Sequence, residues 1–337
     1  MRKKAMLWEG LSGDMVHCFL CAHNCRIADG DYGFCGMRQN VKGELWTCAY
    51  ANIAAGNVDP IEKKPLYHFL PGTSSFSIAT IGCNFRCSFC QNWAISQKSA
   101  KNFADNGYEL NPEEVVQEAL NSGCKSISYT YTEPTIFFEY AYDTARVAAE
   151  NGIKNIFVTN GYMTEKAIEE ISPYLDAVNV DLKFFSDTSY RNICKGKLQP
   201  VLDSVRNMKQ RGIWVEVTTL VVPGLNDSDE ELTGMAEFIA DVGQDIPWHI
   251  SRFHPDYKYT EAVPTPIATL EKAYEIGRKA GLEYIYLGNV LAGGKTFCPR
   301  CNYVLVDREI VSNEMEKDLI KNGACPKCGT EISGVWE

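Results

Sequence analysis

Three cysteines lie on one short loop with the spacing of a metal-binding motif. Cys83, Cys87 and Cys90 have C-x3-C-x2-C spacing and follow the apolar run 76–81. Cysteine thiolates hold iron–sulfur clusters, and three of them can bind three irons of a [4Fe–4S] cluster. The fourth iron is then open to a substrate or cofactor. A tetrahedral zinc site needs a fourth ligand, and none lies in this segment. The spacing therefore predicts a [4Fe–4S] cluster with one open iron.

A second group of cysteines lies near the C-terminus. Two C-x2-C pairs are separated by a β-rich connector at 303–306, a pattern typical of a structural zinc ribbon. Four thiolates close the coordination sphere, so we expect no catalysis there. A rubredoxin-like single iron would use the same ligands and remains the alternative. The four residues are Cys298, Cys301, Cys325 and Cys328.

A third group lies near the N-terminus and predicts a second metal site. Zinc is favoured, and an auxiliary iron–sulfur cluster remains open. Its members are Cys18, Cys21, Cys25 and Cys35. The remaining cysteines fit small buried hydrophobic residues. They are Cys48, Cys124 and Cys194.

Between residues 74 and 290, short β-rich runs alternate with helical patterns. Such alternation predicts a parallel sheet covered by helices, and six strand–helix units are too few for a complete eightfold barrel. Asn111 is the expected cap of one helix, and Pro112 is its expected first residue. Ser228 and Glu231 have the spacing of a capping box, which predicts the start of another helix. The expected strands are 75–80, 125–131, 155–159, 177–182, 214–222, 249–253 and 284–287.

Polar residues follow these strands at the points where the strands end. Because active sites of parallel barrels gather at the carboxyl ends of the strands, we expect one rim to collect these residues beside the cysteine loop. They are Glu133, Asn160, Asp181, Lys183 and His254. Glu133 is expected to accept hydrogen bonds from an ammonium group.

The cysteine loop resembles the signature of the radical S-adenosylmethionine (SAM) superfamily. The run 62–72 (EKKPLYHFLPG) and the residues Gln91-Asn92-Trp93 after the loop resemble the branch related to pyruvate formate-lyase activating enzymes. Within that branch the chain looks most similar to the radical SAM member of the AmmeMemoRadiSam system. The resemblance extends over essentially the whole chain and carries little information about the substrate.

The resemblance implies a fold and a chemistry. The fold is α/β, a partial (β/α)6 TIM-like barrel with small cysteine-rich extensions. The enzyme would cleave SAM reductively at the [4Fe–4S] cluster to a 5′-deoxyadenosyl radical, which abstracts hydrogen from a substrate. The electron would come from an external donor resembling flavodoxin or ferredoxin.

The resemblance also suggests contacts with SAM, one position at a time. Lys183 would meet the SAM carboxylate, Asp181 would orient Lys183 or contact substrate, and His254 would bond to the ribose or carboxylate. Related enzymes often show Gly-Gly-Glu-Pro where this chain has Tyr131-Thr132-Glu133-Pro134, so the glutamate matches and the glycines do not. The other expected SAM contacts are Asn160, Phe89 and Asn92, and Trp93 fits an adenine contact or a core position equally well.

Three segments are expected along the chain. Residues 1–70 form a cysteine-rich metal-binding extension, 71–292 the partial barrel, and 293–337 the zinc-ribbon or rubredoxin-like module. The formal charge of −10 resides mainly in the middle segment, which carries 19 basic and 29 acidic residues. A segment with a net negative charge repels the phosphate backbone of a nucleic acid, so this charge argues against a nucleic-acid substrate. The sequence lacks a secretion signal and a long apolar run, so we expect a cytoplasmic protein that does not enter a membrane.

Three classes of function follow from these patterns. The first is a radical SAM enzyme acting on a macromolecule, either a protein glycyl position, as in the activating enzymes, or an RNA base. The second is a radical SAM enzyme acting on a small molecule. The third is a non-enzymatic electron carrier or metal scaffold, which would need neither an open iron nor a polar rim. We expect the first class.

Overall fold

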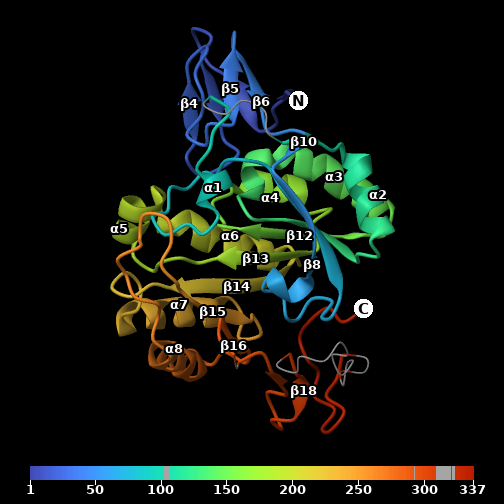
Figure 1. The fold of residues 1–337 in the computed structure, drawn as a ribbon, viewed down its shortest axis with the longest axis vertical. Coiled ribbons are helices and arrows are strands. Elements are labelled where there is room, and N and C mark those ends of the chain that lie inside the picture. Colours follow the sequence, from blue (N-terminus) through green and yellow to red (C-terminus); the bar gives the residue numbers. More distant parts are fainter. Residues whose placement is uncertain (102–106, 292, 309–319, 321–322) are drawn as a thin grey trace.

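The chain is organised around an eight-stranded sheet (Figure 1). The computed structural model describes residues 1–101, 107–291, 293–308, 320 and 323–337. The order of strands is β16-β15-β14-β13-β12-β11-β9-β8, with β8 antiparallel to β9 and every other pair parallel. The strands are β8 (Ala55–Pro60), β9 (Ser74–Ala79), β11 (Ser126–Tyr129), β12 (Lys154–Thr159), β13 (Ala177–Asp181), β14 (Trp214–Val221), β15 (Trp248–Arg252) and β16 (Ile285–Gly288).

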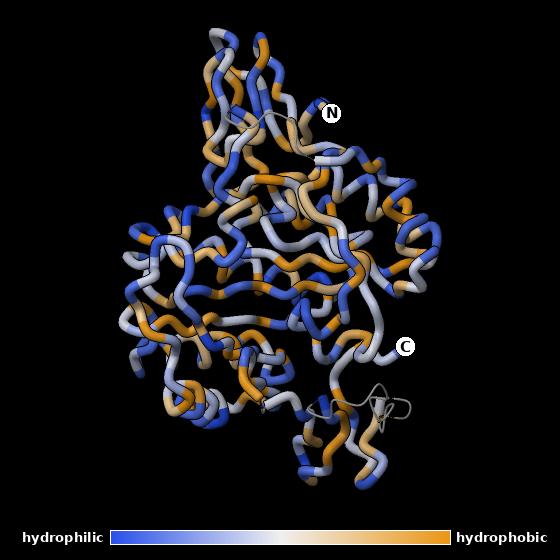
Figure 2. Tube along the Cα trace, viewed as in Figure 1, coloured by the Kyte–Doolittle hydropathy of each residue, from blue (hydrophilic) through white to orange (hydrophobic). Residues whose placement is uncertain are grey.

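The seven parallel strands confirm the seven expected from the sequence, with bounds within two residues. The α/β class with a parallel sheet core is therefore confirmed. The eighth strand, β8, was not expected, because its Gly, Asn, Asp and Pro residues have low β-propensity. It forms an edge of the sheet, where the proline at its end breaks no ladder. Figure 2 shows apolar stretches along the central strands, whose side chains fill the core.

Helices connect successive strands and cover the sheet. Asn111 caps α2 with a complete capping box, and the Ser228 side chain accepts from Glu231 N at the start of α7, so both expected helix starts are confirmed. The helices are α1 (Trp93–Ser96), α2 (Pro112–Asn121), α3 (Phe138–Glu150), α4 (Glu165–Ile171), α5 (Asp187–Ser189), α6 (Leu198–Gln210), α7 (Asp229–Val242) and α8 (Ile267–Ala280), with the 3-10 turns η1 (Ile61–Lys63) and η2 (Pro134–Phe137) and the π-helical turn η3 (Tyr190–Cys194). No helix in the described part of the chain is long and apolar enough to cross a membrane.

The N-terminal residues form small antiparallel sheets beside the main sheet (Figure 1). A buried ion pair between Arg38 and Glu139 attaches them to α3, and Met6 N donates to the same carboxylate at 2.7 Å. Breaking a buried pair of this kind by removing one partner costs about 3–5 kcal/mol. The strands are β1 (Lys3–Lys4), β2 (Trp8–Gly10), β3 (Val16–Cys18), β4 (Cys25–Ile27), β5 (Arg38–Val41), β6 (Glu44–Thr47) and β7 (Asn52–Ile53), which pairs with β10 (Tyr108–Glu109).

The C-terminal module packs on the other side of the sheet, against β16. Its short strands β17 (Thr296–Phe297) and β18 (Val304–Val306) pair, and its core includes Tyr284 and Tyr286. His68 connects the module to the main sheet, since its Nδ1 lies 2.7 Å from Ser333 O and its Nε2 2.6 Å from the Tyr286 hydroxyl. No observation tests the three expected segment boundaries, which stay a prediction.

His68 predicts a dependence of stability on pH. Burial lowers the pKa of His68 to about 4, against 6.5 for an exposed histidine. The unfolded chain therefore binds more protons between these values. The stability that neutral His68 provides is complete above pH 6.5 and is lost as pH falls towards 4, by about 3 kcal/mol. We expect the thermal unfolding midpoint to fall between pH 7 and pH 5.

A matched variant isolates this effect. His68→Gln does not titrate in this range and should show a flatter profile, although it is less stable at pH 7 because its hydrogen bonds are weaker. Parallel profiles for wild type and His68→Gln would contradict the assignment.

Candidate active site

The cysteine loop lies between β9 and α1, at the carboxyl edge of the parallel strands. It begins at Gly82, whose φ of +95° suits glycine and whose N–H donates to Ile95 O at 3.0 Å. Cys83 and Cys87 are buried and Cys90 is half-buried. All three line the wall of one cavity of about 200 Å³. The structure therefore brings together the three thiols that the spacing singled out.

Residues that follow the ends of the other strands line the same cavity. Three of the five expected rim residues are among them, namely Asn160, Asp181 and Lys183. Phe89 and Asn92 from the cysteine loop also line it. The rest of the lining includes Phe85, Gln91, Tyr131, Thr132, Thr218, Leu220, Ser251 and Asn289.

Asp181 and Lys183 form an ion pair on the cavity wall, with Lys183 Nζ 3.0 Å from Asp181 Oδ2. Burial by itself lowers the pKa of Lys183, whereas interactions with the Asp181 carboxylate and with the neighbouring sulfurs of Cys87 and Cys194 raise it. The pKa lies well above the ordinary value of lysine. Lys183 is therefore a fixed cation on the cavity wall, suited to an anionic ligand group.

Glu133 does not line the cavity. Its buried carboxylate accepts hydrogen bonds from Thr135 N at 3.0 Å, Thr159 Oγ1 at 2.7 Å and Asn160 N at 2.8 Å. It also accepts from Thr135 Oγ1 at 2.5 Å. The expected direct contact with an ammonium group thus finds no support in this geometry. Glu133 instead holds the end of β12, which carries Asn160.

Asn160 connects this carboxylate to the cysteine loop. Its backbone N–H donates to Glu133, and its Nδ2 donates to Asn84 Oδ1 at 2.7 Å and lies 3.8 Å from Cys83 Sγ. The end of β12 and the first cysteine are thereby fixed relative to each other. Tyr131, two residues before Glu133, also lines the cavity and has a φ of +61°, a conformation that most residues avoid.

His254 and Trp93 lie outside the cavity lining. His254 contacts Gln91 Nε2 at 3.2 Å, and Gln91 itself lines the cavity. Trp93 is 43 % exposed and stacks on Tyr257 with ring centroids 5.3 Å apart. Trp93 is therefore a surface residue beside the site, rather than part of the core.

Two residues of the site gave weak signals in the sequence. Thr218 lines the cavity, and its Oγ1 is buried and has no hydrogen-bond partner within the described residues. A buried hydroxyl without a partner is costly. Cys194, expected to be a plain buried hydrophobic residue, lies with its Sγ 3.4 Å from Cys87 Sγ.

The N-terminal cysteines come from one small sheet and the turn that follows it. Cys18 and Cys25 are directly opposed on β3 and β4. Burial raises the pKa of Cys21 well above its usual value, and interactions with Cys18, Cys35 and Cys25 raise it further. The module touches the central loop through His23 Nε2, 2.7 Å from Asn84 O.

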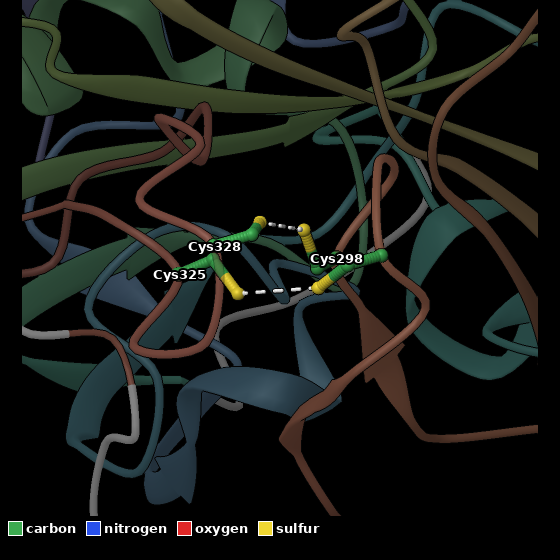
Figure 3. A group of neighbouring side chains, drawn as sticks. Cys298, Cys325 and Cys328 are labelled. Atoms are coloured by element: carbon green, nitrogen blue, oxygen red, sulfur yellow. Dashed lines mark hydrogen bonds between the residues drawn. The ribbon is translucent and has the colours of Figure 1, made fainter.

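The C-terminal cysteines form a compact group of four thiols (Figure 3). Cys298 Sγ lies 3.6 Å from Cys328 Sγ, and Cys301 Sγ lies 3.6 Å from Cys325 Sγ. All four sulfurs lie within 4.8 Å of one another. A tetrahedral ion with metal–sulfur bonds of about 2.3 Å requires sulfurs about 3.8 Å apart, so the group fits one metal ion.

Comparisons with known proteins agree with this site. The radical SAM superfamily matches residues 77–239, which include the cysteine loop and the strands β11–β14. An uncharacterized protein of Methanocaldococcus jannaschii is 43% identical over 336 residues, which cover 99% of both chains. The pyruvate formate-lyase 1-activating enzyme of Escherichia coli is 23% identical and matches 61% of this chain and 89% of its own.

A solved structure is similar in fold. It is a radical SAM methyltransferase from Sphaerobacter thermophilus, with a TM-score of 0.52 and 16% identity over 65% of this chain and 67% of its own. The pyruvate formate-lyase-activating enzyme of Clostridium pasteurianum is 30% identical over 174 residues, which cover 48% of this chain and 67% of its own. The chain therefore belongs to the radical SAM superfamily and is related to the activating enzymes. It is an enzyme of the radical SAM type, and this membership implies a [4Fe–4S] cluster and SAM as cofactors.

Proposed function

We propose that Cys83, Cys87 and Cys90 bind the [4Fe–4S] cluster and that the adjoining cavity binds SAM. The observation that supports this most directly is the common cavity, which is lined by the three thiols and by the Lys183 cation. When bound, the cluster supplies the electron that cleaves SAM to methionine and a 5′-deoxyadenosyl radical. The residues of the chain bind, orient and enclose the reactants.

We propose that the residues lining the cavity make the SAM contacts that the family resemblance implies. Lys183 pairs with the SAM carboxylate, and Asp181 holds Lys183 in place. Asn160 and Thr218 offer polar groups to the rest of the molecule, and Phe89 and Asn92 border it from the cysteine loop. Glu133 positions Asn160 by accepting a hydrogen bond from its backbone N–H. His254 positions Gln91, which lines the cavity, through the contact between their side chains.

The substrate that we propose is a protein, from which the radical abstracts hydrogen as an activating enzyme does from a glycyl position. The relationship to activating enzymes supports this class. So does the stacked Trp93–Tyr257 pair beside the cavity, because exposed aromatic side chains are enriched in protein interfaces. The net charge of −10 favours a protein over RNA. The run 62–72 supports placing the chain with the AmmeMemoRadiSam system.

We also propose two further metal centres and a location. The C-terminal quartet binds a structural zinc, since its sulfur spacing matches a closed tetrahedral site. The N-terminal quartet binds zinc or an auxiliary cluster. A flavodoxin- or ferredoxin-like protein donates the electron, and the abundance of free thiols favours a cytoplasmic enzyme.

The first test removes one ligand of the cluster. Cys87→Ala should abolish the release of 5′-deoxyadenosine from SAM in the presence of a strong reductant, because two thiolates cannot hold the cluster with one open iron. Product is measured by chromatography after anaerobic reconstitution. The control is Cys124→Ala, a buried cysteine at the opposite edge of the sheet. Wild-type release by Cys87→Ala would contradict the assignment.

The second test addresses the SAM carboxylate. Lys183→Met keeps the length of the side chain and removes its charge. A hydrogen bond to a charged group contributes roughly 1.5–3 kcal/mol, so the affinity for SAM should fall about ten- to hundredfold while iron content is retained. Equilibrium binding measures the effect. Lys209→Met, which breaks a Lys–Asp pair with Asp245 far from the cavity, is the control. Equal affinities of both variants would refute this role.

The third test identifies the C-terminal metal. Cys325→Ala removes one of the four ligands of the closed site, so the variant should lose about one zinc ion for each chain. Its iron content should stay complete, because Cys325 is not one of the three cysteines that we assign to the cluster. Metal analysis of the purified variant and of Cys124→Ala gives the comparison. Loss of iron with zinc retained would identify the site as a rubredoxin-like iron instead.

A further inference from the structure

The turn η3 (Tyr190–Cys194) packs directly on the cysteine loop. Arg86 N donates to Cys194 O at 2.9 Å. A Cβ on Gly196 would come within 2.5 Å of the Phe85 ring, so the two segments touch without room for another side chain. The turn is π-helical, and Lys195 after it has a φ of +63°. π-Helical turns are rare and are frequently found at functional sites.

This packing places the thiol of Cys194 against one ligand cysteine. Cys194 is fully buried and Cys87 is 6% exposed, and without a cluster the Cys87 thiol donates a hydrogen bond to Cys194 Sγ at 3.4 Å. A cysteine that binds iron is a thiolate and accepts hydrogen bonds. With Cys87 bound to the cluster, the shared hydrogen must therefore belong to Cys194.

The other two ligand sulfurs also have donors beside them. Phe85 N donates to Cys83 Sγ at 3.3 Å, and the hydroxyl of Ser96 lies 3.2 Å from Cys90 Sγ. Asn160 Nδ2 is a second donor to Cys83 Sγ at 3.8 Å, so with Cys194 each ligand sulfur has at least one neighbouring donor. A plain hydrophobic residue at position 194 would leave Cys87 without the donor that the other two sulfurs have.

We propose that Cys194 is a positioning residue for the cluster, whose thiol donates a hydrogen bond to the sulfur of Cys87 and so raises the reduction potential of the cluster. The physical reason is that hydrogen bonds to cluster sulfurs stabilise the more negative, reduced state. The cluster must be reduced before SAM is cleaved, so the hydrogen bond makes the enzyme easier to activate. The inference rests on the proposed role of Cys87 as an iron ligand.

The test is a redox titration of the reconstituted protein, followed by the EPR signal of the reduced cluster. Cys194→Ala removes the donor and should lower the ratio of reduced to oxidised cluster about threefold to tenfold at a fixed ambient potential. Tenfold corresponds to about 59 mV for a one-electron couple. Cys194→Ser keeps a donor and should titrate at or above the wild-type potential. Cys124→Ala should match wild type.

The outcomes separate this inference from the proposed function. An unchanged potential in Cys194→Ala with full iron content would overturn the role of Cys194 and leave the cluster assignment intact. If Cys194→Ala failed to hold iron, Cys194→Ser would decide, and a potential well below wild type in that variant would overturn the proposal. Retention of the cluster by Cys87→Ala would instead remove the basis of both proposals.

Discussion

The parallel pairing of β9 and β11–β16 is the constraint on which the rest of the structure depends. Parallel strands joined by helical crossovers all end at the same edge of the sheet. Residues as distant in sequence as Cys83, Lys183 and Asn289 therefore line one cavity. A one-residue slip of a strand would turn its side chains to the other face, so the register fixes Asp181 and Thr218 towards the cavity.

Buried polar contacts on the sheet also stabilise this register. Glu216 on β14 accepts from Tyr67 N at 3.0 Å, from His68 N at 2.8 Å and from Trp214 Nε1 at 3.0 Å, and it lies 2.6 Å from His249 Nε2. The segment 62–72 is thereby bound to the strands of the main sheet. A carboxylate buried with so many partners specifies one arrangement, because any other would leave it unpaired. This gives the run EKKPLYHFLPG a structural reason as well as a family resemblance.

The sequence was informative where chemistry depends on spacing or period. The apolar strands and the caps at Asn111 and Ser228 are local patterns, and the structure confirms them. Spacing along the chain also singled out the cysteines that line one cavity and the C-terminal quartet that forms a compact group. It was less informative where the role of a side chain depends on partners distant in the chain. Glu133 looked like a ligand of SAM, yet it is bound to Thr135, Thr159 and Asn160. Cys194 is an isolated cysteine in the sequence, and only the packing of η3 on the cysteine loop brings it to Cys87.

The central claim is that three thiolates hold a cluster whose fourth iron faces the Asp181–Lys183 cavity and binds SAM. Mössbauer spectroscopy of protein reconstituted with 57Fe tests it most directly, in a sample measured before and after SAM is added. The account predicts that a single iron of the cluster changes its isomer shift towards a site of higher coordination, while the other three stay as they were. Four irons unaffected by saturating SAM would contradict it.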